Sequence, residues 1–333
     1  TLQRGIEGAK ANADATQAAA DTARITLVAD VVRAYTQVCA ANEEREIAEH
    51  SLDLQAQSTT LTQRLRDAGR GDETQVTRSQ TQFKSLRADL PRYEAARQAG
   101  LFRLSMLLAK PVDQLPAGTA TCAELPKIAQ LVPVGDGAAL LKRRPDIRQA
   151  ERRLAASTAG IGVATGELYP DISIGATIGT VGLIDDLGDP STNRWGFGPS
   201  LSWKVPTNGA RARIREAEAS TQGALAHFDG VVLNAIRETQ TELAQYTALL
   251  QRRDALADAE QSAKLAADQT HRFFQAGRES FLADLQATRT YTDVTAQLAA
   301  ANTQVAMSQI DLFLALGGGW ESGRTQASSP SKP

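Results

Sequence analysis

The sequence contains a long internal repeat, and this repeat restricts the fold more than any other feature. The segment Ala68-Gly69-Arg70 recurs as Ala276-Gly277-Arg278, an offset of 208 residues, and at the same offset Arg64 meets Arg272. Each copy reads as a long helix, a turn at the glycine and a return helix. We therefore expect two helical hairpins with the same internal plan.

The two helical hairpins are expected at residues 1–109 and 207–316. Their helices are predicted at about residues 3–66, 73–108, 210–275 and 280–316. Between Ile214 and Leu250 the apolar residues are spaced by threes and fours, which is the pattern of a helix that supercoils with a partner. At ~1.5 Å per residue the long helices extend roughly 95 Å, so a compact globule is disfavoured.

Composition removes several classes of function. The net charge of −2 gives no electrostatic reason to bind nucleic acid. No stretch of about 18 apolar residues suggests a transmembrane helix. We find no catalytic motif, cofactor fingerprint or metal-ligand spacing, so we expect no enzyme activity, no cofactor and no metal. His50, His227 and His271 form no pair at helix-face spacing, and we expect them to be solvated.

The composition changes between the two repeats. Residues 110–143 contain four prolines and are expected to form an irregular strap, with a short helix at 138–143. Residues 144–168 are expected to form a helix that leads to the next segment. Pro145 suits the first helical position, and Asp146 places a negative charge in the first turn.

Residues 169–206 alternate strictly between apolar and small polar side chains. The even-numbered residues from Ile172 to Ile178 and the odd-numbered residues from Trp195 to Val205 are apolar, and the residues between them are mostly Gly, Ser and Thr. A loop is expected at 183–194. The pattern predicts two strands with one apolar and one polar face.

Two interpretations fit this hairpin. It is an amphipathic hairpin on a soluble core, or it is part of a transmembrane β-barrel. Trp195 and Trp203 lie about 27 Å apart along a strand, close to the spacing of two aromatic girdles around an apolar band of ~25 Å. Tyr169 would join such a girdle, and the Gly, Ser and Thr face would suit a water-filled lumen. We favour the barrel, whose remaining strands must come from elsewhere.

A longer motif supports a resemblance. The block Arg143-Arg144-Pro145-Asp146-Ile147, followed by Ala150-Glu151-Arg152-Arg153-Leu154 and by the strand start Tyr169-Pro170, resembles the signature of the outer membrane efflux protein family. That family is TolC-like, and the match is nearest to its drug-efflux lipoprotein branch. The resemblance spans essentially the whole chain, including the Ala-Gly-Arg turns.

The resemblance implies a fold and a function. The fold would be mainly α, with long antiparallel helical hairpins forming an α-barrel and strands contributing to a trimeric β-barrel of twelve strands. The protein would be a homotrimer in the cell outer membrane, in contact with outer membrane lipid, with most of the chain in the periplasm. It would act as a passive conduit for drugs or other small molecules. A periplasmic adaptor protein and an inner-membrane transporter would be its partners.

One feature departs from the family pattern. The family has a strand hairpin in each repeat, and the first-copy equivalent of residues 169–206 would fall before Thr1. We therefore expect an N-terminally truncated chain, whose residues 317–333 form a flexible tail. The alternative function is a periplasmic coiled-coil adaptor or scaffold without a pore, which would explain the helices but would not need the hairpin.

Both glycine turns are expected to lie at the periplasmic tips, where threefold symmetry would gather them around an aperture. The tip residues are Gly69, Arg70, Asp72, Glu73, Gly277, Arg278, Glu279 and Asp284. TolC-like proteins typically narrow this end with acidic side chains about six and nine residues past the second glycine, but here those positions are Ala283 and Gln286. One hypothesis is that Arg278 pairs with Asp72 or Glu73 of a neighbouring turn; simple solvated helix ends are the alternative.

The two cysteines allow a further expectation. Cys39 lies near the middle of the first long helix, and Cys122 lies in the strap that would wrap the bundle at about that height. They could pair in an oxidising periplasm. We favour two unpaired cysteines, with Cys39 acting as a small helix-packing residue.

Overall fold

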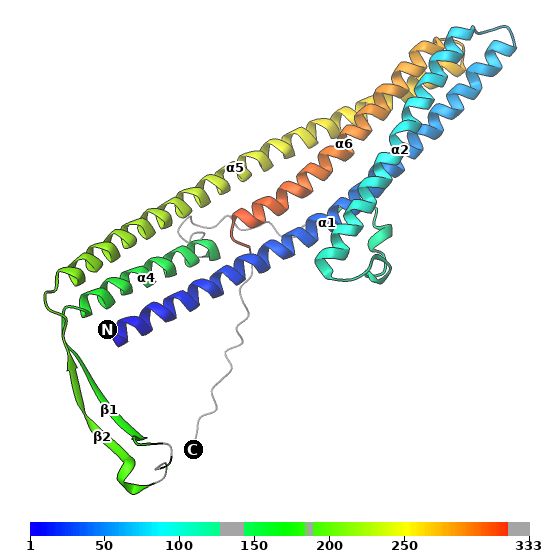
Figure 1. The fold of residues 1–333 in the computed structure, drawn as a ribbon. Helices are drawn as coiled ribbons and strands as arrows, with labels where there is room; N and C mark the ends of the chain where they lie inside the picture. Colours follow the sequence, from blue (N-terminus) through cyan, green and yellow to red (C-terminus); the bar gives the residue numbers. More distant parts are fainter. Residues whose placement is uncertain (127–142, 184, 186–188, 319–333) are drawn as a thin grey trace, which may run out of the picture. The chain divides into compact units, whose positions relative to one another are not determined.

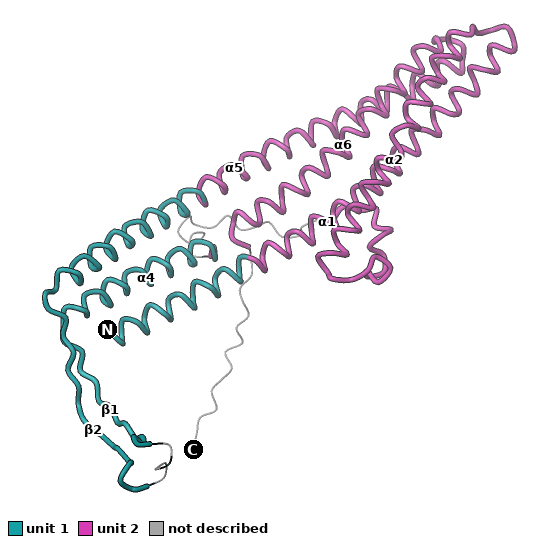
Figure 2. Tube along the Cα trace, viewed as in Figure 1, with its two compact units in different colours: residues 1–22, 144–234 teal, residues 23–143, 235–333 magenta. Residues whose placement is uncertain are grey.

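The computed structural model describes residues 1–126, 143–183, 185 and 189–318. The chain divides into two compact units (Figure 1, Figure 2). Unit 1 comprises residues 1–22 and 144–234, and unit 2 comprises residues 23–143 and 235–333. The short helix expected at 138–143 lies almost entirely outside the described residues, and so does most of the tail expected at 317–333.

Unit 1 consists of three helical segments and a strand hairpin. Helix α1 (Leu2–Asp67) and helix α5 (Asn208–Gln275) both begin in this unit, and α4 (Pro145–Gly166) lies between them (Figure 2). Small residues allow α1 and α4 to approach closely, since a methyl group on Gly8 would lie 3.6 Å from Cβ of Ala159. The helix predicted after Pro145 is confirmed.

The strand hairpin consists of β1 (Asp171–Thr180) and β2 (Asn193–Ser202), which pair antiparallel. Ile172 lies opposite Leu201, and Ile178 lies opposite Trp195. The predicted alternation is therefore confirmed, because every apolar residue of one strand meets an apolar residue or proline of the other. A 3-10 turn, Pro190–Thr192, precedes β2.

Two predicted limits of the second strand are wrong. The strand begins at Asn193, inside the loop expected at 183–194, because Asn193 pairs with Thr180. It ends at Ser202, so Trp203 and Val205 lie beyond it. Continuing the register would place Trp203 opposite Pro170, which has no amide hydrogen to donate. The ladder therefore stops one residue before the tryptophan.

Unit 2 contains both glycine turns. Helix α2 (Glu73–Leu108) returns along α1, and α6 (Phe281–Ala315) returns along α5 (Figure 1). These bounds agree with the predicted helices to within two residues. Together with the two-stranded sheet, they confirm the predicted class of a mainly α chain with an antiparallel β-hairpin.

The helices of unit 2 pack through small, apolar and hydrogen-bonded contacts. A methyl group on Gly100 of α2 would lie only 2.7 Å from Val38 of α1, so glycine is needed at this crossing. The Gln55 amide of α1 donates to Ser79 of α2 at 2.9 Å. Arg33 of α1 pairs with Asp311 of α6. Helix α6 therefore contacts both long helices, since it also bonds to α5.

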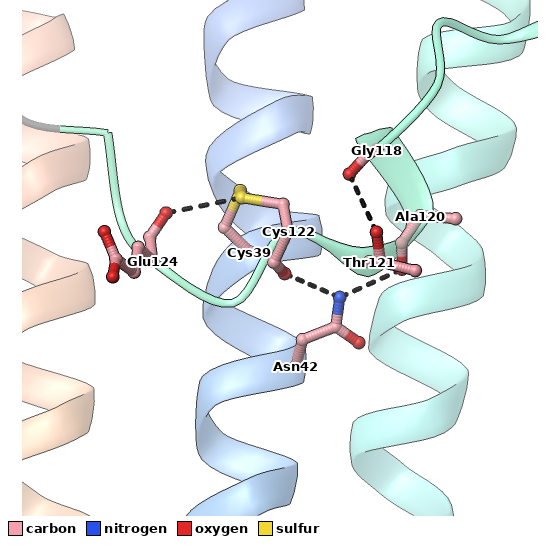
Figure 3. Close-up of a disulfide and its surroundings, with 7 residues drawn as sticks. All are labelled: Cys39, Asn42, Gly118, Ala120, Thr121, Cys122 and Glu124. Carbon is pink, nitrogen blue, oxygen red and sulfur yellow. Dashed lines mark hydrogen bonds between the residues drawn. A yellow bond between two sulfur atoms is a disulfide. The ribbon is translucent and has the colours of Figure 1, made fainter.

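The strap leaves α2 at a left-handed residue, Ala109 (φ 50°), and its described part, residues 110–126, contains two single 3-10 turns, Val112–Gln114 and Thr119–Thr121. The cysteines are bonded to each other, so the expectation of two unpaired cysteines is wrong (Figure 3). Their Cα atoms are 4.7 Å apart, because the strap runs directly across α1 at Cys39.

A side-chain clamp reinforces this crossing. The Asn42 amide, one turn further along α1, donates to the backbone carbonyls of Ala120 at 3.1 Å and Cys122 at 2.7 Å (Figure 3). Asn42 is buried, and these two bonds satisfy both of its N–H groups. The strap is therefore fixed to α1 by one covalent and two hydrogen bonds.

Candidate functional site

The hairpin presents an apolar face that is exposed among the described residues of the chain. Ile174, Ile178, Trp195 and Phe197 are all at least 74% exposed. The opposite face is small and polar, and there the Ser173 and Ser200 hydroxyls bond across the ladder at 2.7 Å. A contiguous exposed apolar surface marks an interface with protein or lipid. The apolar face is thus the first candidate site.

Both strands of this hairpin are also edge strands, since the sheet has two strands. Each therefore leaves a row of backbone N–H and C=O groups without a partner in the ladder. In lipid such edges must be closed by further strands. Trp203, outside the strand, uses its indole Nε1–H to donate to the Leu168 carbonyl at 3.3 Å.

The family-signature residues lie at the start of α4. The Arg144 side chain is buried and donates through Nε and Nη2 to the two carboxylate oxygens of Asp146, at 3.1 and 2.7 Å. Asp146 also accepts from the Ile147 amide at 2.9 Å, and Pro145 occupies the first helical position. Arg143 is exposed. The motif therefore fixes the beginning of α4.

The first tip, residues 63–76, connects α1 to α2. Gly69 has φ 68°, the left-handed conformation predicted for it. Asp72 caps α2 by accepting from the Gln75 amide at 2.9 Å, and Glu73 pairs with Arg66 at 3.0 Å. Arg70 is exposed, with its side chain outside these bonds.

The second tip, residues 271–284, connects α5 to α6 with different side chains. Gly277 has φ 71°, and the Ser280 hydroxyl caps α6 by accepting from the Ala283 amide at 3.1 Å. Arg278 and Glu279 are exposed. The rings of Phe274 and Phe281 meet edge to face with centroids 6.0 Å apart.

Asp284 differs from the other predicted tip residues because it is only 6% exposed. Its carboxylate lies 3.2 Å from Nδ1 of His271, whose Nε2 lies 2.9 Å from the Gln275 amide nitrogen. His50, His227 and His271 are all exposed, as expected, but His271 also pairs with Asp284, which was not predicted. The pairing spans a turn, so spacing along one helix face could not reveal it.

The described residues contain neither a membrane-spanning helix nor a metal cluster. None of their helices is long and apolar enough to cross a membrane. Within the same residues, no group of three His, Cys, Asp or Glu side chains lies close enough together to hold a metal ion.

Comparison with known proteins gives the class of protein. A family model described as outer membrane efflux protein matches residues 1–110 and 138–318. The outer membrane protein OprJ of Pseudomonas aeruginosa is 30% identical over 313 residues, covering 93% of this chain and 65% of OprJ. Nodulation protein T of Rhizobium leguminosarum biovar trifolii is 29% identical over 324 residues, covering 96% and 68% respectively.

Solved structures of outer membrane channels are also similar to this chain. The outer-membrane channel OprN superposes with a TM-score of 0.87 at 33% identity, covering 96% of this chain and 72% of OprN. The MtrE outer membrane channel of Neisseria gonorrhoeae gives 0.84 at 25% identity, with the same two coverages. The chain belongs to the outer membrane efflux protein family. It spans about two thirds of the length of the curated relatives it matches.

Family membership confirms the resemblance inferred from the Arg-Arg-Pro-Asp-Ile block. It places the chain in the outer membrane, with its long helices in the periplasm. OprJ, OprN and MtrE are outer membrane proteins or channels, and none of the three is an adaptor. The adaptor alternative therefore has no support.

Proposed function

We propose that this chain is the outer membrane channel component of an efflux or export system and that it conducts small molecules passively from the periplasm to the exterior. The observation that carries the proposal is the apolar face of the β1–β2 hairpin, which is exposed along its whole length. A soluble scaffold would not maintain such a surface. The helices supply a periplasmic extension of the barrel.

The same hairpin supports a homotrimer. Two strands cannot close a barrel, and both are free to pair at their outer edges. Further strands, including those of other copies, must complete the ladder. Tyr169, Trp195 and Trp203 then lie at the two boundaries of the apolar band, where aromatic side chains are favoured.

We further propose that the two tips face a periplasmic adaptor, which couples the channel to an inner-membrane transporter. Each tip exposes charged side chains next to a glycine turn, notably Arg70 at the first and Arg278 at the second. In the trimer, Arg278 pairs with Asp72 or Glu73 of a neighbouring turn and helps to close the aperture. Such partly exposed ion pairs contribute ~0.2 to 1 kcal/mol each, so a docking partner can break them.

The orientation of the hairpin is tested by single cysteine substitutions in the full-length protein in native outer membranes. Cys39 and Cys122 are bonded to each other, so neither of them competes with an introduced cysteine for the reagent. A membrane-impermeant aqueous thiol reagent should label Ser173→Cys and Thr177→Cys but not Ile174→Cys or Ile178→Cys.

Each polar position in this experiment has an apolar neighbour as its matched control. The two differ by one residue and therefore by the face of the strand on which they lie. Equal labelling at both kinds of position would remove the barrel assignment and with it the proposed conduction.

A further inference from the structure

A cavity of about 350 Å³ lies in unit 2 where α1, α2 and α6 meet. Its volume is within the range of small-molecule sites, which begins at about 300 Å³. Tyr93 and Ala299, at its inner end, are buried, whereas Asp89, Arg92 and Asp293 are exposed. The cavity therefore extends from solvent into the interface between the three helices.

The walls of this cavity combine apolar and acidic groups. Ile47 of α1 and Leu86 of α2 line it together with alanines of α6. Glu44, Asp89 and Asp293 provide three carboxyl groups, one from each helix, against a single cation, Arg92. The cavity therefore has apolar surface and an excess of negative charge.

Arg92 neutralises these carboxylates only in part. Its guanidinium lies over the Tyr93 ring at 4.7 Å from the centroid, and Nη2 donates to the Tyr93 hydroxyl at 2.8 Å. Asp89 is 4.0 Å away, at the limit of an ion pair. The Glu44 carboxylate accepts one long hydrogen bond, from the Thr303 hydroxyl at 3.5 Å.

Glu44 is the innermost of the three carboxyl groups. Burial raises its pKa, and the attraction of Arg92 and the Thr303 hydrogen bond only oppose that rise. A raised pKa means that the neighbouring groups do not fully offset the cost of burying the Glu44 carboxylate in its charged form. A second cation beside Glu44 would relieve this cost.

A metal ion does not fit the cavity. Among the described residues, no three potential ligands converge on one point, so these carboxylates surround the space without meeting. The cavity calls for a ligand with one positive charge and an apolar surface. An organic cation has both, because its charged end can reach one carboxylate while its apolar body covers Ile47 and Leu86.

We propose that this cavity binds small organic cations, such as primary ammonium compounds with a compact apolar body, with the ammonium group at Glu44. The ammonium donates hydrogen bonds to the carboxylate, and the apolar body lies between α1, α2 and α6. Asp89 and Asp293 attract the cation to the entrance. This binding site is separate from the aperture and goes beyond passive conduction.

The proposal is tested by isothermal titration calorimetry on the full-length protein in a nonionic detergent. The probes are 1-adamantylamine and its uncharged analogue 1-adamantanol, which differ in charge but hardly in shape. The amine should bind about tenfold more tightly, because both probes can donate a hydrogen bond to the Glu44 carboxylate but only the ammonium adds the attraction between opposite charges. The affinity of the amine should fall as the pH is lowered through the titration of Glu44.

Three variants locate the site. Glu44→Gln should remove most of the preference for the amine, and Arg92→Gln should increase it by removing the competing cation. Glu49→Gln is the matched control, since Glu49 lies on the same helix, is exposed and does not line the cavity. The Glu49→Gln protein should bind the amine with the same affinity as the unmodified protein.

The assay does not depend on conduction, so it separates this proposal from the proposed channel function. Circular dichroism of each variant would show that the helices are intact. Equal binding of amine and alcohol, an unaltered amine affinity in Glu44→Gln, or no binding of either probe would each overturn the proposal.

Discussion

The first and second tips have the same backbone but opposite side-chain chemistry. In each, the residue after the glycine donates its amide to a carbonyl five residues earlier at 2.8 Å, from Arg70 to Leu65 and from Arg278 to Phe273. Each return helix also begins with a side-chain cap. The two turns are therefore equivalent in conformation.

The side chains across these turns differ at matched repeat positions. Arg66 and Glu73 form an ion pair at the first tip, whereas Phe274 and Phe281, at the equivalent positions, form an aromatic contact at the second. The buried Val76 of the first tip corresponds to the buried Asp284 of the second. Glycine and the caps thus fix the turn, which leaves the contacts between the helices free to diverge.

The largest expected effect on stability comes from placing the buried carboxylate of the second tip at the equivalent position of the first. Val76→Asp should destabilise the protein by about 3–5 kcal/mol, because Val76 is 1% exposed and the new carboxylate would be buried without a cation. Adding Gln63→His supplies the equivalent of His271 and should recover part of the loss. Thermal unfolding monitored by intrinsic fluorescence or circular dichroism measures both variants.

The exposed Thr77→Asp change on the neighbouring residue serves as the control for the added charge. If Val76→Asp were as stable as this control, the buried positions of the two tips would not be equivalent, and the comparison would fail.

A smaller effect separates the ion pair from the aromatic pair. Phe281→Ala should cost about 2–4 kcal/mol, because Phe281 is 7% exposed and its removal leaves a cavity. Glu73→Ala, at the matched position, should cost less than about 1 kcal/mol, since its ion pair with Arg66 is solvent-exposed. Chemical denaturation of the two variants gives the comparison.

The dependence on salt concentration further distinguishes the ion pair of the first tip from the aromatic contact of the second. The cost of Glu73→Ala should shrink at high ionic strength, whereas the cost of Phe281→Ala should not. Similar costs for the two substitutions would show that the tips do not differ in the way described.

The smallest energetic effect concerns the two arginines that follow the glycines. Arg278→Ala should raise single-channel conductance of the full-length protein in planar bilayers, because it would remove the weak contact that we propose helps to close the aperture. Arg70→Ala is the matched control and should leave conductance unchanged. An equal response of the two variants, or no change in Arg278→Ala, would leave Arg278 as a simple helix-end charge.

Local features made most of the fold predictable. The glycine turns and caps lie within a few residues of one another, so the helix bounds could be predicted from the sequence. The alternation from Ile172 to Ile178 likewise predicted which residues share one face of the hairpin, whereas the pairing of individual residues came from the structure. The limits of β2 depended on which residue lies opposite, and Pro170 ended the ladder before Trp203.

The unpredicted parts depend on contacts between distant segments. The Cys39–Cys122 bond requires the strap to cross α1 at one helical turn, and no local pattern specifies that height. The His271–Asp284 pair requires two helices to meet across a turn. Of the candidate sites, the exposed hairpin face followed from the sequence, whereas the cavity beside Glu44 could not be anticipated.

The disulfide adds a covalent link to the first helical hairpin that the second helical hairpin lacks. With a sequence separation of 83, it closes a loop that contains the end of α1, the first tip and all of α2. A protease that cuts once at the first tip therefore leaves a single covalent molecule until the disulfide is reduced. The same cut at the second tip separates the chain into two fragments at once.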